Sequence, residues 1–227
     1  MSNELLFFIT ILVSFSGVIL AYRFFGKAGI FGWVGFATLL ANIEVIKCVD
    51  MFGMSVTLGN VLYGSTFLAT DILNEIYGGK TSRKAVRMGF YMLIVFIPLS
   101  QTSLLYTPNE ADFANDAIQT IYHFSPRICA ASLIAYIISN TLNSYLYNWL
   151  GSFTHRIWIK NNCSTLICQA LDTVLFTILG FLGIFEWNII LELILTTYAI
   201  KFIVAICDTP FIYIANHMAK SKTSDNL

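Results

Sequence analysis

The sequence predicts an all-α, polytopic membrane helix bundle with about seven transmembrane helices. Of its 227 residues 57% are hydrophobic and only 11% are charged, whereas soluble domains average about 45–50% apolar and about 25% charged residues. The apolar residues form long continuous runs. Most of the basic residues lie in every second connection between these runs. Such a composition excludes an ordinary soluble enzyme, a disordered chain and a nucleic-acid binder.

The apolar runs predict seven spans in succession. Residues 5–22 carry no charge and are long enough to cross a bilayer. No basic segment precedes this run and no small-residue cleavage site follows it, so we expect a retained helix rather than a signal peptide. Continuous rather than alternating hydrophobicity argues against the strands of a membrane barrel. The remaining spans are predicted over residues 30–49, 55–77, 88–106, 127–149, 163–184 and 191–217.

The connections support this division and predict its orientation. Gly78 and Gly79 provide a stop after the third span, and residues 107–125 form the longest polar connection. With the N-terminus outside and the C-terminus inside, ten of the thirteen basic residues fall on the inner side, as the positive-inside rule requires. Residues 1–219 are then expected to form a single integral membrane domain, and residues 220–227 a polar cytoplasmic tail.

Charged residues inside the predicted spans are the candidate functional residues. Each costs at least about 2.5–3.5 kcal/mol at the bilayer centre, so such residues are usually retained for ligand sites, pathways or pairing. Several recur at helical spacing, which places them on one face of their helix. The set comprises Glu44, Lys47, Asp71, Glu75, Arg127, Asp172, Lys201 and Asp208.

Uncharged polar and aromatic residues extend these faces. Phe67 lies one turn before Asp71, Gln169 lies one turn before Asp172, and Tyr136 and Asn140 share a face of the fifth span. Lipid cannot solvate such faces, so we expect them to converge on one another or on a water-filled cavity. Carboxylates and amides that accept from N–H groups, together with flat rings that stack, suit a small, planar, polar heterocycle.

Several of these charges also have a purely structural interpretation. Glu44 and Lys47 form an i,i+3 pair near the outer boundary, Arg127 could extend to the outer interface, and Glu75 could pair with Lys80 or Arg83. No sequence motif of a catalytic centre or of a nucleotide-binding loop is present. The five cysteines include no C-x-x-C pair, so we predict no cofactor and no metal site.

Several blocks of the sequence resemble the queuosine precursor transporter family, a group also described as vitamin uptake transporters. The first block is Ala69-Thr-Asp-Ile-Leu-Asn-Glu-Ile-Tyr-Gly-Gly-Lys80 followed by Arg83-Lys84-Ala85. The other matching positions are Asn42 and Lys47; Arg127, Ala131, Ser132 and Tyr136; Ser164, Thr165, Gln169, Asp172 and Thr173; and Lys201, Thr209 and Pro210.

The resemblance implies an importer of 7-deazaguanines in the bacterial inner membrane. Its expected substrates are queuine, 7-cyano-7-deazaguanine and 7-aminomethyl-7-deazaguanine, which are salvaged for queuosine in transfer RNA. Asp172 and Gln169 are expected to bind the guanine-like edge, with Phe67 or Tyr136 stacking on the ring. The other expected lining residues are Asn140, Asp71, Glu75, Arg127, Lys201 and Asp208.

Two other functions stay open at this level. The family is distantly similar to the substrate-binding subunits of energy-coupling factor transporters, so the chain could be one component of a larger vitamin or nucleobase uptake system. An intramembrane enzyme that uses paired carboxylates is the third hypothesis, although no nucleophile–base spacing supports it. The expected partners are the small heterocycle, the lipid bilayer and a second copy of the chain in a homodimer, with no nucleic acid.

Overall fold

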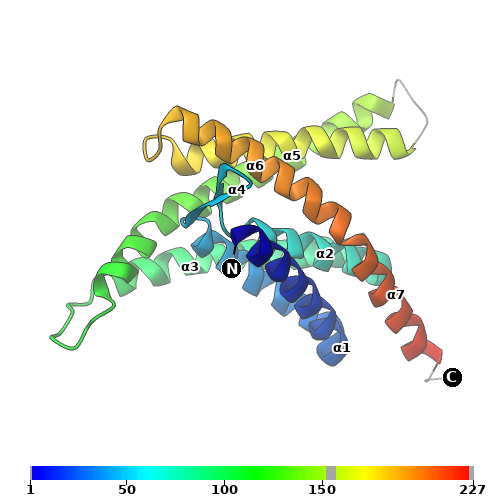
Figure 1. Cartoon of the computed structure of the whole chain (residues 1–227). Coiled ribbons are helices and arrows are strands. Elements are labelled where there is room, and N and C mark those ends of the chain that lie inside the picture. The colour runs from blue at the N-terminus through cyan, green and yellow to red at the C-terminus, as the bar shows by residue number, and fades with distance from the viewer. Residues whose placement is uncertain (1, 152–156, 225–227) are drawn as a thin grey trace. The chain divides into compact units, whose positions relative to one another are not determined.

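The structure is a computed structural model that describes the backbone of residues 2–151 and 157–224. Side chains are described for these residues except 140, 143, 144, 147, 148, 150, 151, 157–165, 205, 209 and 220–224. Nearly all of the described chain is helical (Figure 1). The elements are α1 (Asn3–Glu44), β1 (Cys48–Met51), β2 (Met54–Thr57), α2 (Asn60–Tyr77), α3 (Gly79–Ser103), α4 (Asn115–Gly151), α5 (Ile157–Phe181), α6 (Trp187–Cys207) and α7 (Thr209–Ser224).

Helix α1 consists of two helical halves that fold back on each other at Gly26. The backbone there has φ 57° and ψ −136°, a conformation essentially reserved for glycine. A Cβ added at Gly17 would lie only 2.3 Å from the Trp33 ring, although a straight helix would separate these residues by about 24 Å. The turn falls between the first two predicted spans.

A β-hairpin follows α1, where helix was predicted, so the boundaries at residue 49 and residue 55 are wrong. β1 and β2 pair antiparallel, with Met51 opposite Met54. The two residues of the turn, Phe52 and Gly53, both have positive φ, as a tight two-residue hairpin turn requires. The Asn3 side-chain amide donates to the Asp50 carbonyl oxygen at 2.7 Å, so the N-terminus lies beside the hairpin.

Two helices in the middle of the chain begin earlier than hydropathy predicted, whereas α2 ends at Tyr77 as expected. Gly78, with φ 80°, ends α2, and its N–H donates to the Asn74 carbonyl oxygen. α3 then begins at Gly79, so the basic segment expected as a loop is helical. α4 begins at Asn115 within the predicted polar connection. Hydropathy locates the lipid-facing part of a helix, but backbone hydrogen bonds continue beyond that part.

The last predicted span, residues 191–217, is broken at Asp208. α6 ends at Cys207 and α7 begins at Thr209. Pro210 has no N–H group to continue the helical hydrogen bonds and is favoured in the first turn of a new helix. The Asp208 carbonyl oxygen instead accepts the N–H groups of Phe211 and Ile212, which starts α7. α7 continues into the segment expected as a polar tail, as far as Ser224.

The chain divides into two compact units. Unit 1 comprises Met1–Ser125 and Ala199–Leu227, and unit 2 comprises Pro126–Tyr198. The core of unit 1 lies between α1, α2 and α7, where Phe15 packs edge-to-face on Phe211 with ring centres 5.2 Å apart. In unit 2, α4 packs against α5, so that a Cβ added at Gly180 would lie 3.4 Å from Ile128.

The surface of the helices is apolar, as in proteins whose solvent is lipid. Exposed large apolar side chains occur along several helices, among them Val13, Leu99 and Leu195. In the part of the chain that the structure describes, four helical stretches are long and apolar enough to cross a membrane. They are Asn3–Glu44, Gly79–Ser103, Asn115–Ser139 and Trp187–Val204. The all-α membrane bundle predicted from the sequence is consistent with this fold.

Candidate functional site

The polar residues of α2 lie on its least buried face. Because α2 is one continuous helix from Asn60 to Tyr77, Phe67, Asp71 and Glu75 follow one another at intervals of four residues along one side. Asp71 and Glu75 are exposed, whereas Leu68 and Ile72 on the opposite side are fully buried in the core of unit 1. The predicted polar face of this helix therefore exists and points away from the core.

Two charged residues of the last span are buried in unit 1. Lys201 is 8% exposed and Asp208 is 7% exposed. The Lys201 ammonium group lies 5.8 Å from the centre of the Tyr63 ring, within the range of a cation–π interaction. At the other end of the same stretch, Asp208 lies close enough to Asp71 for like-charge repulsion between the two carboxylates.

A close approach of the two helices brings these groups together. A Cβ added at Gly64 would lie 2.3 Å from a methyl carbon of Val204, so the helices nearly touch at that level. Lys201 lies by Tyr63, Val204 packs on Gly64 and Asp208 is near Asp71, and the two stretches therefore run in the same direction. The third and the seventh predicted spans are expected to cross the membrane in the same direction, and the parallel arrangement agrees with that expectation.

We call Tyr63, Phe67, Asp71, Lys201 and Asp208 the α2/α6 polar site. Four of these residues are predicted site residues. Tyr63 was missed, although it lies four residues before Phe67 on the same stripe, and their rings meet edge-to-face at 5.3 Å. The site combines one buried cation, two neighbouring carboxylates and two aromatic rings. In a medium of low dielectric these groups interact strongly with one another and with any polar solute.

Arg127 has a structural role in unit 2. Its guanidinium group donates from Nε to the Leu179 carbonyl oxygen at 2.9 Å, and from Nη2 to the Leu182 carbonyl oxygen. These carbonyls lie at the C-terminal end of α5, where the last helical carbonyl groups lack partners within the helix and attract cations. Arg127 therefore caps α5, and its expected contact with substrate stays a prediction.

The other predicted residues of unit 2 lie on α4 and α5. Gln169 and Asp172 are half-buried at an i,i+3 spacing on α5, and Tyr136 is half-buried on α4. The Thr173 hydroxyl donates to the Gln169 carbonyl oxygen at 2.8 Å. Asn140 lies in α4, but its side chain is outside the described residues.

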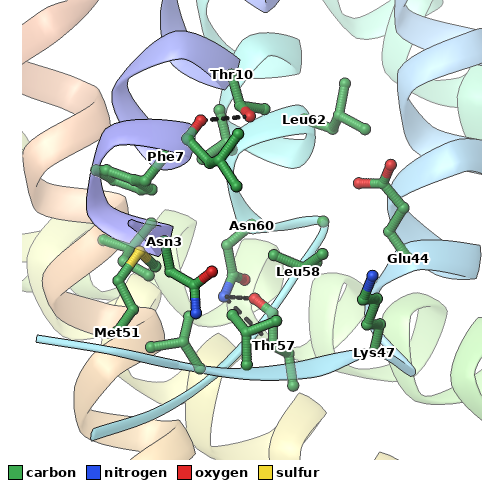
Figure 2. A pocket seen from close by; sticks show the side chains of 16 residues that line it. Asn3, Phe7, Thr10, Glu44, Lys47, Met51, Thr57, Leu58, Asn60 and Leu62 are labelled. Atoms are coloured by element: carbon green, nitrogen blue, oxygen red, sulfur yellow. Dashed lines mark hydrogen bonds between the residues drawn. The ribbon is translucent and has the colours of Figure 1, made fainter. Parts of the chain in front are cut away.

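A cavity beside the β-hairpin is a further feature of unit 1 that the sequence did not predict. We call it the hairpin cavity; its volume is about 280 Å³. Figure 2 shows Glu44 and Lys47 on one side of it and Asn3 on the other, with Asn60 between them. The Asn60 amide donates to the carbonyl oxygen of Thr57 at 3.1 Å. The cavity depends on the hairpin and on both ends of α1, which lie far apart in the sequence.

The hairpin cavity and the α2/α6 polar site are neighbours along the same two helices. Leu62 and Ile200 line the cavity, and the next residues in the chain, Tyr63 and Lys201, form the first level of the polar site. From there the site extends along α2 to Asp71. Unit 1 therefore carries polar groups from the hairpin end through the length of α2.

The opposite end of unit 1 carries the Gly26 turn. Lys27 follows this turn, and its ammonium group lies 5.5 Å from the centre of the Tyr77 ring at the end of α2. The turn and the α2–α3 junction at Gly78 are therefore at one end, whereas the N-terminus and the β-hairpin are at the other. The two connections of unit 1 that are expected on the inner side, at Gly26 and at Gly78, therefore lie together.

Apolar helices that carry a buried lysine and a buried aspartate define a polytopic membrane protein built around a polar site, as solute transporters are. The family model described as "Putative vitamin uptake transporter" matches residues 57–215, and the chain belongs to this family. It is a transporter of the bacterial cytoplasmic (inner) membrane and not an enzyme.

Curated relatives carry more specific names. A protein of Bacillus subtilis (strain 168) named "Probable queuosine precursor transporter" is 42% identical over 210 residues, which cover 91% of this chain and 92% of the relative. The "Queuosine precursor transporter" of Escherichia coli (strain K12) is 29% identical over 143 residues, which cover 62% of each chain. No solved structure matches the chain significantly.

Proposed function

We propose that this chain imports queuosine precursors, 7-deazaguanines such as queuine, 7-cyano-7-deazaguanine and 7-aminomethyl-7-deazaguanine. The observation that carries the proposal is the α2/α6 polar site, in a chain that is 42% identical over most of its length to a relative named for this transport. A 7-deazaguanine has neighbouring N–H donors on one edge, which a carboxylate accepts in a bidentate manner. Its flat face suits aromatic side chains.

The residue roles follow from this chemistry. Asp172 and Gln169 bind the donor edge of the heterocycle, with Asn140 as a further amide, and Phe67 or Tyr136 stacks on the ring. Asp71, Glu75, Arg127, Lys201 and Asp208 line the pathway or form ion pairs that rearrange as access alternates. The burial of Lys201 and Asp208 supports this role in the pathway. Buried charges in a membrane helix are costly, and they are usually retained for ligand sites, pathways or pairing.

The proposed topology has seven spans, with the N-terminus outside and the C-terminus inside. The two halves of α1 are the first two spans, and α6 with α7 forms the last. The arrangement of unit 1 supports this topology, since its successive connections lie at opposite ends. Residues 1–219 then make a single transporter domain, and residues 220–227 a cytoplasmic tail.

A homodimer completes the proposal. Exposed apolar helix faces, such as the one that includes Leu195, can contact a second copy as well as lipid. Light scattering of the purified protein in detergent measures this directly: twice the chain mass supports the dimer, and a single chain mass rejects it.

Ligand binding by the purified protein tests the function. Queuine, its two precursors, guanine and common vitamins are titrated in turn, and binding confined to the 7-deazaguanines is expected. The Asp172→Asn variant should insert normally but lose uptake of labelled queuine, whereas Glu110→Gln, in an exposed connection, should behave as the wild type. Tight binding of a vitamin instead of a 7-deazaguanine rejects the substrate class, and undiminished uptake by Asp172→Asn rejects the site.

A further inference from the structure

A largely apolar groove with three cationic residues in its lining lies on unit 1 between the second half of α1 and the start of α3. Its volume is about 870 Å³, and its lining includes Lys27 from α1 and Lys84 and Arg87 from α3. All three cations are exposed. Among the described residues that line the groove, none is acidic. The groove is separate from the α2/α6 polar site, and the transport proposal gives it no role.

The groove changes from charged to apolar along its length. Phe31 lies one turn after Lys27 on α1, and Tyr91 lies one turn after Arg87 on α3. Both helices begin at the Gly26 end of the unit, so the cations lie at that end and the apolar residues lie further along the same helices. Tyr91 is 65% exposed. An amphiphile with an anionic head and an apolar chain matches this order.

The space is a local separation of two helices that otherwise touch. A Cβ added at Gly35 would lie 2.2 Å from the Met92 sulfur, and one added at Gly89 would lie 3.0 Å from the Thr38 hydroxyl oxygen. At Gly32, by contrast, an added Cβ meets no atom within 4 Å. The helices are therefore packed beyond the groove and open at Gly32, where an acyl chain has room.

We propose that this groove binds one anionic phospholipid of the bilayer, with its phosphate held by Lys27, Lys84 and Arg87 and an acyl chain lying over Phe31, Gly32 and Tyr91. Basic pockets between helices at a membrane surface bind anionic headgroups in this way. Each interfacial cation contributes about fivefold in affinity for an anionic lipid. Loss of all three should weaken binding by about a hundredfold.

Native mass spectrometry of the full-length protein tests the proposal with phosphatidylglycerol as the probe. The triple variant Lys27→Gln/Lys84→Gln/Arg87→Gln should lose bound phosphatidylglycerol. The matched control is Arg23→Gln/Lys80→Gln/Arg83→Gln, which removes the same charge from nearby positions of α1 and α3 that lie outside the groove lining. The control should retain phosphatidylglycerol within twofold of the wild type.

Two further arms separate a lipid site from other interpretations. Gly32→Trp keeps every cation but fills the apolar floor, so it should reduce phosphatidylglycerol binding at least tenfold; its melting temperature shows whether it is folded. Phosphatidylethanolamine, which carries no net charge, should bind the wild type weakly. Equal losses in both triple variants would show a diffuse charge effect and overturn the proposal. Displacement of the lipid by millimolar inorganic phosphate would show a phosphate site and overturn it as well.

Discussion

The ammonium group of Lys201 lies 5.8 Å from the centre of the Tyr63 ring, and Asp208 follows it two turns later, opposite Asp71. A buried cation over an aromatic face interacts by up to about 2 kcal/mol when desolvated. Lys201 therefore links the two helices of the polar site.

Replacement of Lys201 should separate the effect of charge from that of size. Lys201→Met keeps the long apolar stem but removes the cation, so we expect the free energy of unfolding to fall by about 2 kcal/mol and uptake to be lost. Lys201→Arg keeps a cation over the Tyr63 ring and should retain most of the stability. Thermal unfolding in detergent measures both variants. Equal melting temperatures for Lys201→Met and Lys201→Arg would show that the charge at this position does not contribute to stability.

Asp71→Asn should raise stability while it removes function. Asp71 and Asp208 repel each other, so neutralising one of them is expected to raise the free energy of unfolding by on the order of 1 kcal/mol. In a chain of this size that corresponds to about 2–4 °C in melting temperature. Uptake of labelled queuine should fall at least tenfold. A destabilised variant would contradict the repulsion, and the exposed Glu110→Gln is the control.

Arg127→Gln distinguishes a helix cap from a substrate ligand. The variant loses a cationic donor to the Leu179 and Leu182 carbonyl oxygens, which should cost about 1–3 kcal/mol. If Arg127 also contacts substrate, the dissociation constant for queuine should rise in protein that is still folded at 10 °C. An unchanged constant with a lowered melting temperature assigns Arg127 to the cap alone.

Cys48 reports on the orientation of the β-hairpin. In a variant whose other cysteines are replaced by serine, a membrane-impermeant maleimide should label intact cells at Cys48, which is exposed on β1. Desolvation by the surrounding protein raises the pKa of the Cys48 thiol although the side chain is accessible. Because the thiolate is the nucleophile, labelling should be slow at pH 7 and accelerate as pH rises towards the pKa.

The matched control for orientation is the Ser82→Cys variant, in which Cys48 is also replaced by serine. Ser82 lies in the first turn of α3 at the Gly26 end of unit 1, which is the predicted inner side. It should react only after the cells are permeabilised. Labelling of Ser82→Cys in intact cells, with Cys48 protected, would invert the proposed topology.

The sequence predicted those parts of the fold that depend on local signals. Gly26 and Gly78 separate apolar runs, and both adopt the positive φ that a sharp break between helices requires. The hairpin at Phe52 and Gly53 was missed, because two four-residue strands extend an apolar run and give no signal of their own. The break at Asp208 was also missed, although Pro210 marks it, since the surrounding run is continuously apolar.

The same distinction applies to the candidate site. Helical spacing was enough to place Phe67 and Asp71 on one face, and the structure confirms that face. The pairing of Asp71 with Asp208 and of Tyr63 with Lys201 depends on the close approach at Gly64, which only tertiary packing creates. The hairpin cavity needs three segments that are distant in the chain, so no sequence pattern could reveal it.

Uptake of labelled queuine into proteoliposomes that contain only this purified chain tests the central claim most directly. The account predicts that the chain alone brings queuine into the vesicles, that excess 7-cyano-7-deazaguanine competes with it, and that Asp172→Asn vesicles stay empty. Vesicles that bind queuine without internalising it would assign the chain to the binding subunit of a larger system. Vesicles that neither bind nor import any 7-deazaguanine would contradict the proposed function.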